Sequence, residues 1–305
     1  MVGEKNMVNV KSKKVKQSLD NQIFFVITIA IILFITAICI IPFIYLIAVS
    51  FSGSEPVLRG EVFLWPKEFS VDVYKNIFKN GTMVSAMVRT IGVTFLSVAV
   101  SMTMTILCAY PLSVTGLKGK KIIIPFIMVT MYFSGGLIPG YLLINGLGLI
   151  DSYWSLIIPG AVSTYNMLVL RSFFNSIPST IKEAAVIDGA GDVKVLLNIV
   201  LPLSKPALAT IALWVAVGRW NGLQDALLYI NDPSKAVLQV RLKQMIMSTD
   251  AINELLVEGA SVGNAIPLQT ARAGALIFSM IPILIVYPFL QKYFVKGTMI
   301  GSVKG

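Results

Sequence analysis

Histidine is absent from the 305 residues of this chain, and only two cysteines are present. Histidine is the most common general base and a frequent metal ligand, so its absence argues against hydrolytic or metal chemistry within this chain. We therefore expect no catalytic residue and no metal site. Both cysteines, Cys39 and Cys108, lie inside apolar runs, where a thiol behaves as a small buried hydrophobic group.

Charged residues are also scarce in this sequence. They make up 13% of the chain, whereas 56% of the residues are hydrophobic and the mean hydropathy is +0.80. A typical soluble domain is about 25% charged. The composition therefore predicts an integral membrane protein.

Polar segments separate six apolar stretches that are long enough to cross a bilayer as helices. No charge occurs from Asn21 to Ser54, a run much longer than the apolar core of a signal peptide, so we expect an uncleaved first transmembrane helix. The predicted fold class is all-α, with transmembrane helices at about 23–51, 86–115, 122–143, 154–174, 203–230 and 273–290. These helices form one domain over 23–294, which lies between an N-terminal segment over 1–22 and a tail over 295–305.

The distribution of lysine and arginine predicts the topology. Six crossings place both termini on one side of the membrane, and that side carries 15 of these residues against 9 on the other. Because basic residues are enriched in cytoplasmic loops, the termini, the turn at Gly116–Lys121 and the segment 178–206 are predicted to be cytoplasmic. The net charge of +10 is then a topology signal, and we expect a lipid membrane but no nucleic acid as a partner.

The segment 178–206 is the longest charged connection on the predicted cytoplasmic side. Its sequence predicts two short helices joined by an elbow at Gly189 and Gly191, with the second helix broken by Pro202 and Pro206. One interpretation is a solvated connector. The apolar residues of the first helix favour the other interpretation, a docking surface for a soluble partner.

This segment resembles the EAA loop of binding-protein-dependent ABC importer permeases. The family pattern is Glu-Ala-Ala, three residues, Gly, nine residues, Ile, any residue and Leu-Pro, and its spacing is matched throughout. The residues that match this pattern, or its sugar-importer version EAAxxDGA, are Glu183, Ala184, Ala185, Asp188, Gly189, Ala190, Ile199, Leu201 and Pro202. Leu196 replaces the aromatic residue that often precedes the isoleucine by three positions.

The resemblance covers nearly the whole chain. The stretches Thr130–Leu143 and Arg219–Ile230 and the ending YFVKGTMIGSVKG are similar to sugar permeases of the maltose-importer inner-membrane type. The GGLIP sequence in the first stretch resembles the LplC-like branch, which is associated with complex oligosaccharides. The resemblance implies a type I ABC importer permease fold, a multi-pass location in the bacterial plasma (inner) membrane, and import of a sugar, an oligosaccharide above all, by alternating access.

Two alternatives to sugar import remain open. The EAA pattern is shared with permeases for other solutes, so an ABC importer permease for a non-sugar solute is one alternative. An ion-coupled secondary transporter is the other, since it would explain the hydropathy, although it would not explain the EAA spacing.

The resemblance also implies several partners. In the family, the EAA loop forms a coupling helix that sits in a groove of an ATP-hydrolysing subunit. We therefore expect an ABC ATPase dimer, a second homologous permease subunit in a heterodimer, and an extracellular or periplasmic solute-binding protein. This chain lacks the GxxxxGK[ST] phosphate-binding sequence. It is thus expected to hold no cofactor and to be no enzyme itself, with ATP and Mg used by the partner ATPase.

Polar side chains in the predicted spans are candidates for the substrate path, because each costs free energy unless it faces protein or water. They are Asn145, Tyr165, Asn166, Arg219, Trp220, Asn221, Gln224 and Asp225. In one continuous helix, Trp220 shares a face with Gln224, and Asn221 shares a face with Asp225. A sugar ring could then stack on Trp220. Alternatively, Trp220 lies at the membrane interface, and the two charged residues satisfy partners in the other subunit.

Two longer segments, 52–85 and 231–270, lie on the predicted outer side. A short surface helix is predicted at Val71–Asn80, and Leu238–Glu258 also has helical character. We predict that these segments contact the binding protein, with packing over the helix bundle as the alternative.

Overall fold

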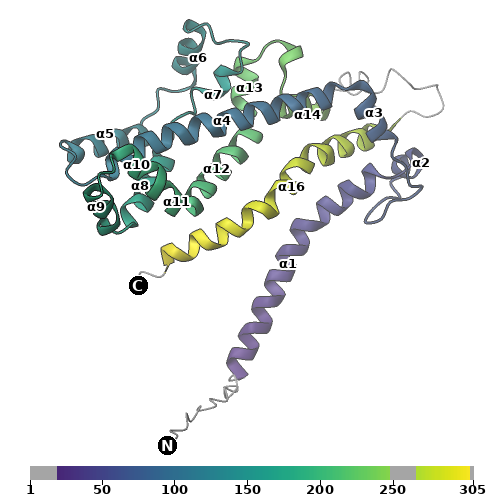
Figure 1. Ribbon diagram of the computed structural model, residues 1–305. Helices are drawn as coiled ribbons and strands as arrows, with labels where there is room; N and C mark the ends of the chain where they lie inside the picture. The colour runs from purple at the N-terminus through teal and green to yellow at the C-terminus, as the bar shows by residue number, and fades with distance from the viewer. Residues whose placement is uncertain (1–18, 248–265, 303–305) are drawn as a thin grey trace, which may run out of the picture.

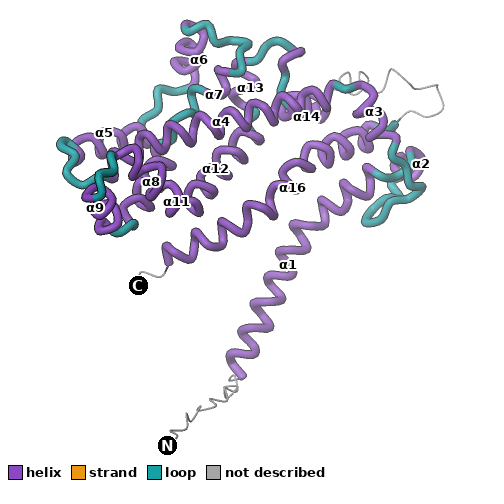
Figure 2. The backbone as a smooth tube through the Cα atoms, viewed as in Figure 1, coloured by secondary structure: helices purple, strands orange, loops and turns teal. Residues whose placement is uncertain are grey.

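The computed structural model describes residues 19–247 and 266–302, and every regular element in these two ranges is a helix (Figures 1 and 2). Three helices are long and apolar enough to cross a membrane, namely α1 (Leu19–Ser50), α4 (Thr82–Ser113) and α16 (Leu268–Ser302). The all-α prediction is confirmed. The parts of the predicted segments that fall at 1–18, 248–265 and 303–305 lie outside the described residues.

Two further apolar segments form sharply bent helix pairs. Helices α5 (Lys120–Tyr132) and α6 (Leu137–Gly146) meet at 107°, and the helical segment Asp192–Leu203 meets α12 (Lys205–Trp220) at 81°. If each pair is one span, the described ranges contain up to five candidate spans. The prediction of one continuous helix over 122–143 is therefore wrong.

Glycine and proline explain the corner between α5 and α6. Gly136 has φ 88° and ψ 175°, a backbone conformation that is essentially restricted to glycine. Pro139 follows in the first turn of α6, where a missing N–H costs nothing because it has no partner within the helix. The GGLIP sequence thus forms a corner rather than the middle of a straight helix.

The predicted fourth span is also interrupted. The structure has two helices there, α7 (Trp154–Ile157) and α8 (Thr164–Ser176), and Pro159 and Gly160 lie between them. Proline has no N–H to continue the hydrogen-bond ladder of a helix. The side chain of Ser163 then caps the start of α8. Hydropathy found the apolar stretch, but it did not show that the helix breaks.

The remaining helices are short, and they connect or cover the long ones. They are α2 (Ser54–Leu58), α3 (Asp72–Asn80), α9 (Ser179–Ile187), α10 (Asp192–Val195), the π-helical turn η1 (Leu196–Val200), α11 (Leu201–Leu203), α13 (Gln224–Tyr229), the 3-10 turn η2 (Pro233–Lys235) and α14 (Leu238–Met247). Helix α3 buries Val73 and Ile77. Helix α14 packs against α4 and α16, so the described part of the second outer segment covers the bundle.

Helix α4 is the central element of the bundle (Figure 1). It packs against α8 and α12 and also contacts α3, α7 and α14. Its buried residues include a series of small or hydroxylated side chains: Thr90, Ser97, Ser101, Thr105 and Ala109. Small side chains let helix backbones approach closely, which is typical of helix packing in lipid.

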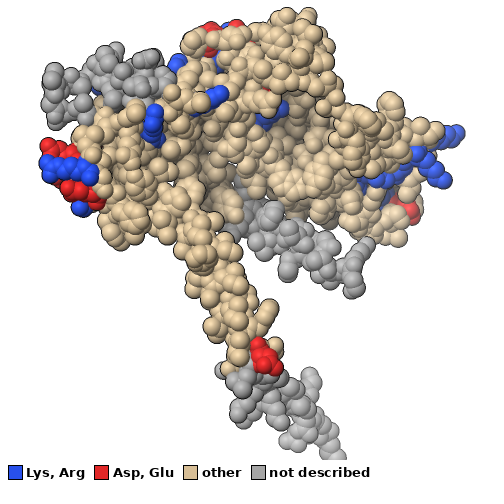
Figure 3. All heavy atoms as spheres, turned by 180° about the vertical axis from the view of Figure 1, so that it is seen from behind, with Lys and Arg blue, Asp and Glu red and all other residues tan. Residues whose placement is uncertain are grey.

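The outer surface of the molecule also suits a membrane. Figure 1 shows that α1 leaves the bundle over its N-terminal half, and none of the most apolar window of this helix is buried. On the face seen in Figure 3, charged side chains gather at the two sides, a few basic groups lie singly between them, and most of the remaining surface is uncharged. Apolar surface of this extent is stable when lipid or another subunit covers it.

Candidate functional site

Residues 178–206, which we call the EAA segment, form two helical pieces at one end of the bundle, beside α5 (Figure 1). The first piece, α9, is anchored by Lys182, whose Nζ donates a 2.7 Å hydrogen bond to the carbonyl oxygen of Phe174 in α8. Carbonyl groups in the last turn of a helix lack partners within it, and lysine is a favoured donor there. Burial, together with the nearby Lys120, lowers the pKa of Lys182. Helix α9 is therefore fastened to the end of α8.

A Schellman motif ends α9 and explains the spacing of the EAA pattern. Gly189 has a left-handed φ of 82°, its N–H donates to the Val186 carbonyl at 3.0 Å, and the Ala190 N–H donates to the Ala185 carbonyl at 2.9 Å. In this motif the residue with positive φ, here Gly189, lies four positions after the residue whose carbonyl accepts the final hydrogen bond, here Ala185. Ala185 and Ala190 also pack on one apolar cluster. The spacing of Ala185, Gly189 and Ala190 in the EAA pattern is thus explained by the geometry of one helix end.

The second helical piece continues past Pro202, so the predicted break there is wrong. Helix α10 passes through η1 into α11, and the Leu201 N–H bonds to the Leu196 carbonyl in a π-type turn. Such a wider turn occurs where the regular ladder is disturbed, and Pro202 follows it directly at the start of α11. The chain bends by 81° at Ser204 instead, and Pro206 is accommodated in the first turn of α12.

The outward face of the EAA segment is largely apolar. Ile187 is 86% exposed, Val193 is 69% exposed and Val186 is 56% exposed. Glu183 shares a face of α9 with Ile187, because the two residues are four positions apart. Of the motif residues, Glu183, Ala184, Asp188, Gly189 and Pro202 are exposed, whereas Ala185, Ala190, Ile199 and Leu201 are half-buried. An apolar face of this kind is suited to a protein partner.

The inward face of the same segment is fixed to the bundle. Val195 and Val200 are buried in the apolar cluster that also contains Phe174 of α8. The Tyr110 hydroxyl of α4 donates a 3.1 Å hydrogen bond to the Asp192 carbonyl at the start of α10. The EAA segment therefore lies against α4 and α8 as a packed unit.

The polar candidates at the other end of α12 do not lie on one helix. Helix α12 ends at Trp220, and the Asn221 side-chain amide donates a 3.0 Å hydrogen bond to the Val217 carbonyl. The same carbonyl also accepts a 3.1 Å hydrogen bond from the Asn221 backbone N–H, so Asn221 closes the last turn of the helix with both groups. Helix α13 starts only at Gln224. The predicted sharing of one helix face by Trp220 and Gln224, and by Asn221 and Asp225, is therefore wrong.

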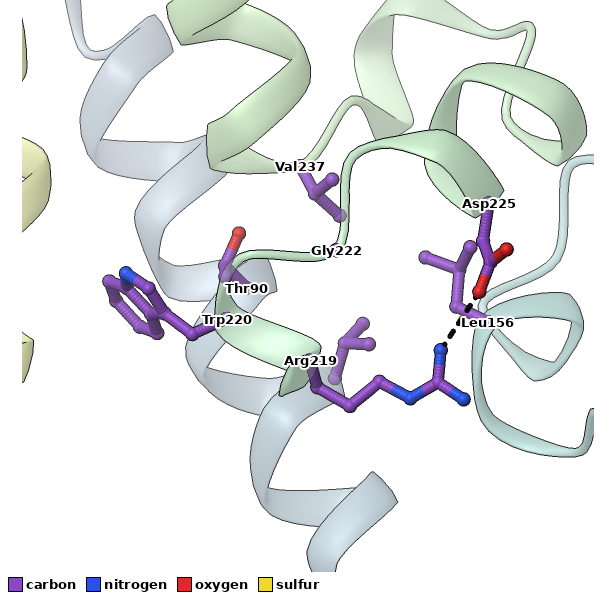
Figure 4. A pocket seen from close by; sticks show the side chains of 8 residues that line it. Thr90, Leu156, Arg219, Trp220, Gly222, Asp225 and Val237 are labelled. Atoms are coloured by element: carbon purple, nitrogen blue, oxygen red, sulfur yellow. Dashed lines mark hydrogen bonds and ion pairs between the residues drawn. The ribbon is translucent and has the colours of Figure 1, made fainter. Parts of the chain in front are cut away.

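Arg219 and Asp225 nevertheless meet across this turn (Figure 4). Arg219 Nη1 lies 3.1 Å from Asp225 Oδ2, and the exposed fractions of the two side chains are 16% and 47%. Gly160 lies against the guanidinium so closely that a Cβ atom there would be 1.7 Å from Arg219 Nη2. Gly160 is thus a site residue that sequence reasoning missed, and only its place in an interrupted apolar run could have hinted at it.

Trp220 is one of the residues that line the small cavity beside this ion pair, but its ring is packed away from the two charged groups. Its side chain is 6% exposed and packs in a cluster with Leu238 and Met245 of α14. In Figure 4 its ring points away from Arg219 and Asp225. In this conformation, Trp220 is a packing residue rather than a surface on which a sugar ring stacks.

The cavity beside the ion pair is small. It has a volume of about 20 Å³, and its lining includes Thr90, Leu156, Arg219, Asp225 and Val237. About one water molecule fits a cavity of this size, and a sugar ring does not. The polar site is therefore closed in this conformation.

The other predicted path residues do not line this cavity. Asn145 in α6 and Gln224 in α13 are exposed, and Asn166 in α8 is buried. The ring of Tyr165 lies 5.7 Å from the ring of Trp214 in α12, measured between centroids. Of the predicted set, the structure thus brings Arg219, Asp225 and Trp220 to one cavity and leaves the others elsewhere.

Asp151 is a structural residue that the sequence did not single out. Its φ is 57°, a left-handed value that aspartate adopts more readily than most side chains. Its Oδ1 accepts hydrogen bonds from the backbone N–H groups of Asn231 at 2.6 Å and Asp232 at 2.8 Å, and Lys235 Nζ donates to its carbonyl at 3.0 Å. It thereby joins the loop after α6 to the loop around η2. No local pattern reveals this link, because the partners are 80 residues or more away.

A solved structure shares this fold. It is described as the crystal structure of a bacterial ABC transporter involved in the import of the acidic polysaccharide alginate, and one of its chains matches this one with a TM-score of 0.84. The two chains are 32% identical, and the match covers 91% of this chain and 99% of that chain. The fold is therefore that of an ABC importer permease.

Proteins of similar sequence show which kind of ABC importer permease this chain is. The polygalacturonan/rhamnogalacturonan transport system permease protein YtcP of Bacillus subtilis is 41% identical over 287 residues, covering 94% of this chain and 100% of the relative. Protein LplC of the same organism is 42% identical over 270 residues, covering 88% and 90%. The trehalose/maltose transport system permease protein MalG of Thermococcus litoralis is 31% identical, covering 88% and 92%. No family model matches the chain. The chain belongs to the membrane permeases of carbohydrate ABC transport systems, which confirms the resemblance seen in its sequence.

Proposed function

We propose that this chain is one permease subunit of an ATP-driven importer that moves an oligosaccharide into the cell by alternating access. The observation that carries the proposal is the EAA segment, which is fastened to the bundle on one face and presents an apolar face outward. Such a chain binds its partner subunits and provides the path through which the substrate moves. ATP hydrolysis, with Mg, belongs to a separate ABC ATPase dimer.

The outward face of the EAA segment fits a groove in that ATPase. Ile187, Val186 and Val193 supply apolar contact area that water exposure disfavours. Glu183 is exposed, and none of the described residues forms an ion pair with it, so its carboxylate is available to a basic group or to backbone donors of the partner. The methyl group of Ala184 leaves room for a close approach.

The connection from the EAA segment to α12 supports a rigid-body movement. Helices α10 and α11 are continuous with η1 and pack on the buried cluster of Val195 and Val200. Only Ser204 separates α11 from α12. A push by the closing ATPase dimer on α9 is therefore delivered to α12, and rigid-body movement of packed elements is a common way to switch between two states.

The proposed arrangement in the bacterial plasma membrane has six crossings. They are α1, α4, the bent pair α5–α6, the pair α7–α8, α12 and α16, with both termini and the EAA segment in the cytoplasm. The excess of lysine and arginine on that side supports this orientation. The exposed apolar surface of α1 suits lipid and a second, homologous permease subunit in a heterodimer. The outer segments around α3 and α14 are proposed to contact a solute-binding protein.

The substrate class follows from the similar proteins. The names given above for YtcP and MalG, and the description of the solved transporter, refer to carbohydrates. Two of these carbohydrates, polygalacturonan and alginate, are polymers of carboxylated sugars. We therefore propose an oligosaccharide as substrate rather than a non-sugar solute.

Purification and transport measurements test this function. The tagged chain is purified from the membranes of its own host, and the complete complex is placed in proteoliposomes with its binding protein. We expect an ATPase subunit and a second, non-identical permease to co-purify, and labelled oligosaccharide to enter only with ATP. A chain that purifies without an ATPase and moves solute with an ion gradient would contradict the proposal and favour a secondary transporter.

A further inference from the structure

Arg219 is a cation that α12 holds with little exposure to water. It lies in the last turn of the helix, and its side chain is 16% exposed. Between Pro206 and Gly218 this helix carries no other charged residue. A cation in a membrane-spanning helix is costly, and such residues usually pair with a carboxylate or serve a function. Asp225 supplies the carboxylate in this conformation.

The pairing of Arg219 is incomplete. A guanidinium group has five N–H donors and forms its strongest contacts when two of them bind one carboxylate side by side. Within the described residues, Arg219 donates a single hydrogen bond to a carboxylate, from Nη1 to Asp225 Oδ2 at 3.1 Å. The guanidinium therefore keeps donors with which it can bind another carboxylate.

The surroundings hold the guanidinium in place. Gly160 lets the backbone between α7 and α8 approach within contact distance of Nη2, where any larger residue would displace it. Leu156, Val93 and Val237 line the adjacent cavity with apolar side chains. Weakly polar surroundings strengthen charge pairing relative to water. The site is thus built to fix a cation in position and to favour an anion next to it.

The Asp225 carboxylate is placed so that it can separate from the Arg219 guanidinium and pair with it again. Its side chain is 47% exposed, against 16% for Arg219, so the carboxylate can regain water more easily than the guanidinium can. It also belongs to α13, which is separated from α12 by the turn at Gly222 (Figure 4). Movement of α13 relative to α12 would open the cavity without unwinding either helix.

We propose that Arg219 recognises the carboxylate of a uronate-containing oligosaccharide, and that Asp225 occupies the guanidinium until the sugar carboxylate replaces it. The inference rests on the proposed function of the chain in sugar import. One carboxylate replaces another, so the charge at the site does not change. Arg219 then selects acidic sugars, and Asp225 closes the site when no acidic sugar is present.

The test compares two substrates of equal length in the reconstituted importer. They are a trigalacturonate and its carboxyl-reduced, neutral derivative, and the measured quantity is the ratio of their uptake rates at low concentration. In the Arg219→Gln variant we expect this acidic-to-neutral ratio to fall about tenfold, as for loss of a charge-assisted hydrogen bond. The Arg219→Lys variant keeps the charge but loses the paired donors, and its ratio should fall less. In the Asp225→Asn variant the ratio should stay equal or rise.

A ratio that falls in Arg219→Gln but does not fall in Asp225→Asn separates recognition from a structural role. If both variants lower the uptake of both sugars by the same factor, the pair only holds the corner between α12 and α13 and the inference is wrong. If the wild-type importer takes up the neutral sugar but not the acidic one, the inference also fails while the proposed function stands. If it takes up neither sugar nor any other oligosaccharide, the proposed function itself fails.

Discussion

In the EAA segment, the hydrogen bonds that set the backbone join residues close in sequence, whereas the corner around Arg219 is assembled from separate parts of the chain. Gly189 and Ala190 donate to Val186 and Ala185, all within six residues. The guanidinium of Arg219 lies instead between Asp225 and the distant Gly160. The first arrangement leaves a fixed spacing in the sequence, whereas in the second only Arg219 and Asp225 are close in sequence and the contact with Gly160 leaves no local pattern.

The EAA segment and the corner around Arg219 should respond differently to substitution. Changes in the EAA segment should act through backbone conformation and affect the contact with the ATPase. Changes around Arg219 should act through space and charge and affect the substrate side. Measurements that separate ATPase coupling from substrate handling therefore test whether the two regions are distinct.

Substitution of Gly160 by valine is expected to have the largest effect. A Cβ atom at this position would be 1.7 Å from Arg219 Nη2, so the guanidinium must leave Asp225. Leaving a buried charge without its partner costs about 3–5 kcal/mol; Asp225 is 47% exposed and can regain water, so we expect a smaller loss, roughly 2 kcal/mol. The melting temperature of the purified importer should drop, and sugar uptake should be lost.

The matched control for Gly160→Val is Gly218→Ala. Gly218 precedes Arg219 in α12, and no atom lies within 4 Å of the position that its Cβ would take. Alanine is favoured over glycine in a helix by roughly 0.5–1 kcal/mol, so this variant should be at least as stable as the wild type. A Gly160→Val importer with unchanged melting temperature and uptake would show that Gly160 does not position the guanidinium.

Substitution of Gly189 by valine should have the next largest effect, at the opposite end of α12. The φ of 82° is left-handed, which costs a non-glycine residue about 1–2 kcal/mol and a β-branched one more. The Schellman motif should open while the protein stays in the membrane. We expect less ATPase subunit in a pull-down and more ATP hydrolysed for each sugar imported.

Gly191→Val provides the control for Gly189→Val. Gly191 has φ −70° and ψ 164°, and no atom lies within 4 Å of its Cβ position, so valine fits there without strain. The two variants add the same side chain two residues apart. Equal loss of ATPase in both would mean that bulk on the docking face, rather than the left-handed turn, is responsible.

The two regions show how far sequence reasoning reached. Composition and hydropathy predicted an all-α membrane protein, and the spacing around Gly189 predicted the elbow after α9 because a helix end is a local structure. Hydropathy did not reveal the breaks at Gly136 and at residues 158–163, since it reports how apolar a stretch is and not whether its helix is continuous. The contact of Gly160 with Arg219 could not be predicted, because it depends on how separate helices pack.

Substitution of Tyr110 by phenylalanine should have the smallest effect. The Tyr110 hydroxyl donates a 3.1 Å hydrogen bond to the Asp192 carbonyl and so joins α4 to α10. Phenylalanine keeps the edge-on contact with the ring of Phe174, whose centroid lies 6.4 Å away. Loss of one such hydrogen bond costs about 1 kcal/mol. We expect a modest rise in the ATP hydrolysed for each sugar imported, with the acidic-to-neutral uptake ratio unchanged.

Tyr132→Phe is the control for this last substitution, because Tyr132 is 77% exposed at the end of α5. It removes the same hydroxyl group without separating α4 from α10, so its coupling should equal that of the wild type. The Tyr110→Phe variant could instead change the acidic-to-neutral uptake ratio more than the ATP hydrolysed for each sugar imported. That result would show that the two ends of α12 are more tightly coupled than proposed. The EAA segment and the Arg219 corner would then act as one site in energetic terms, although their contacts are separate.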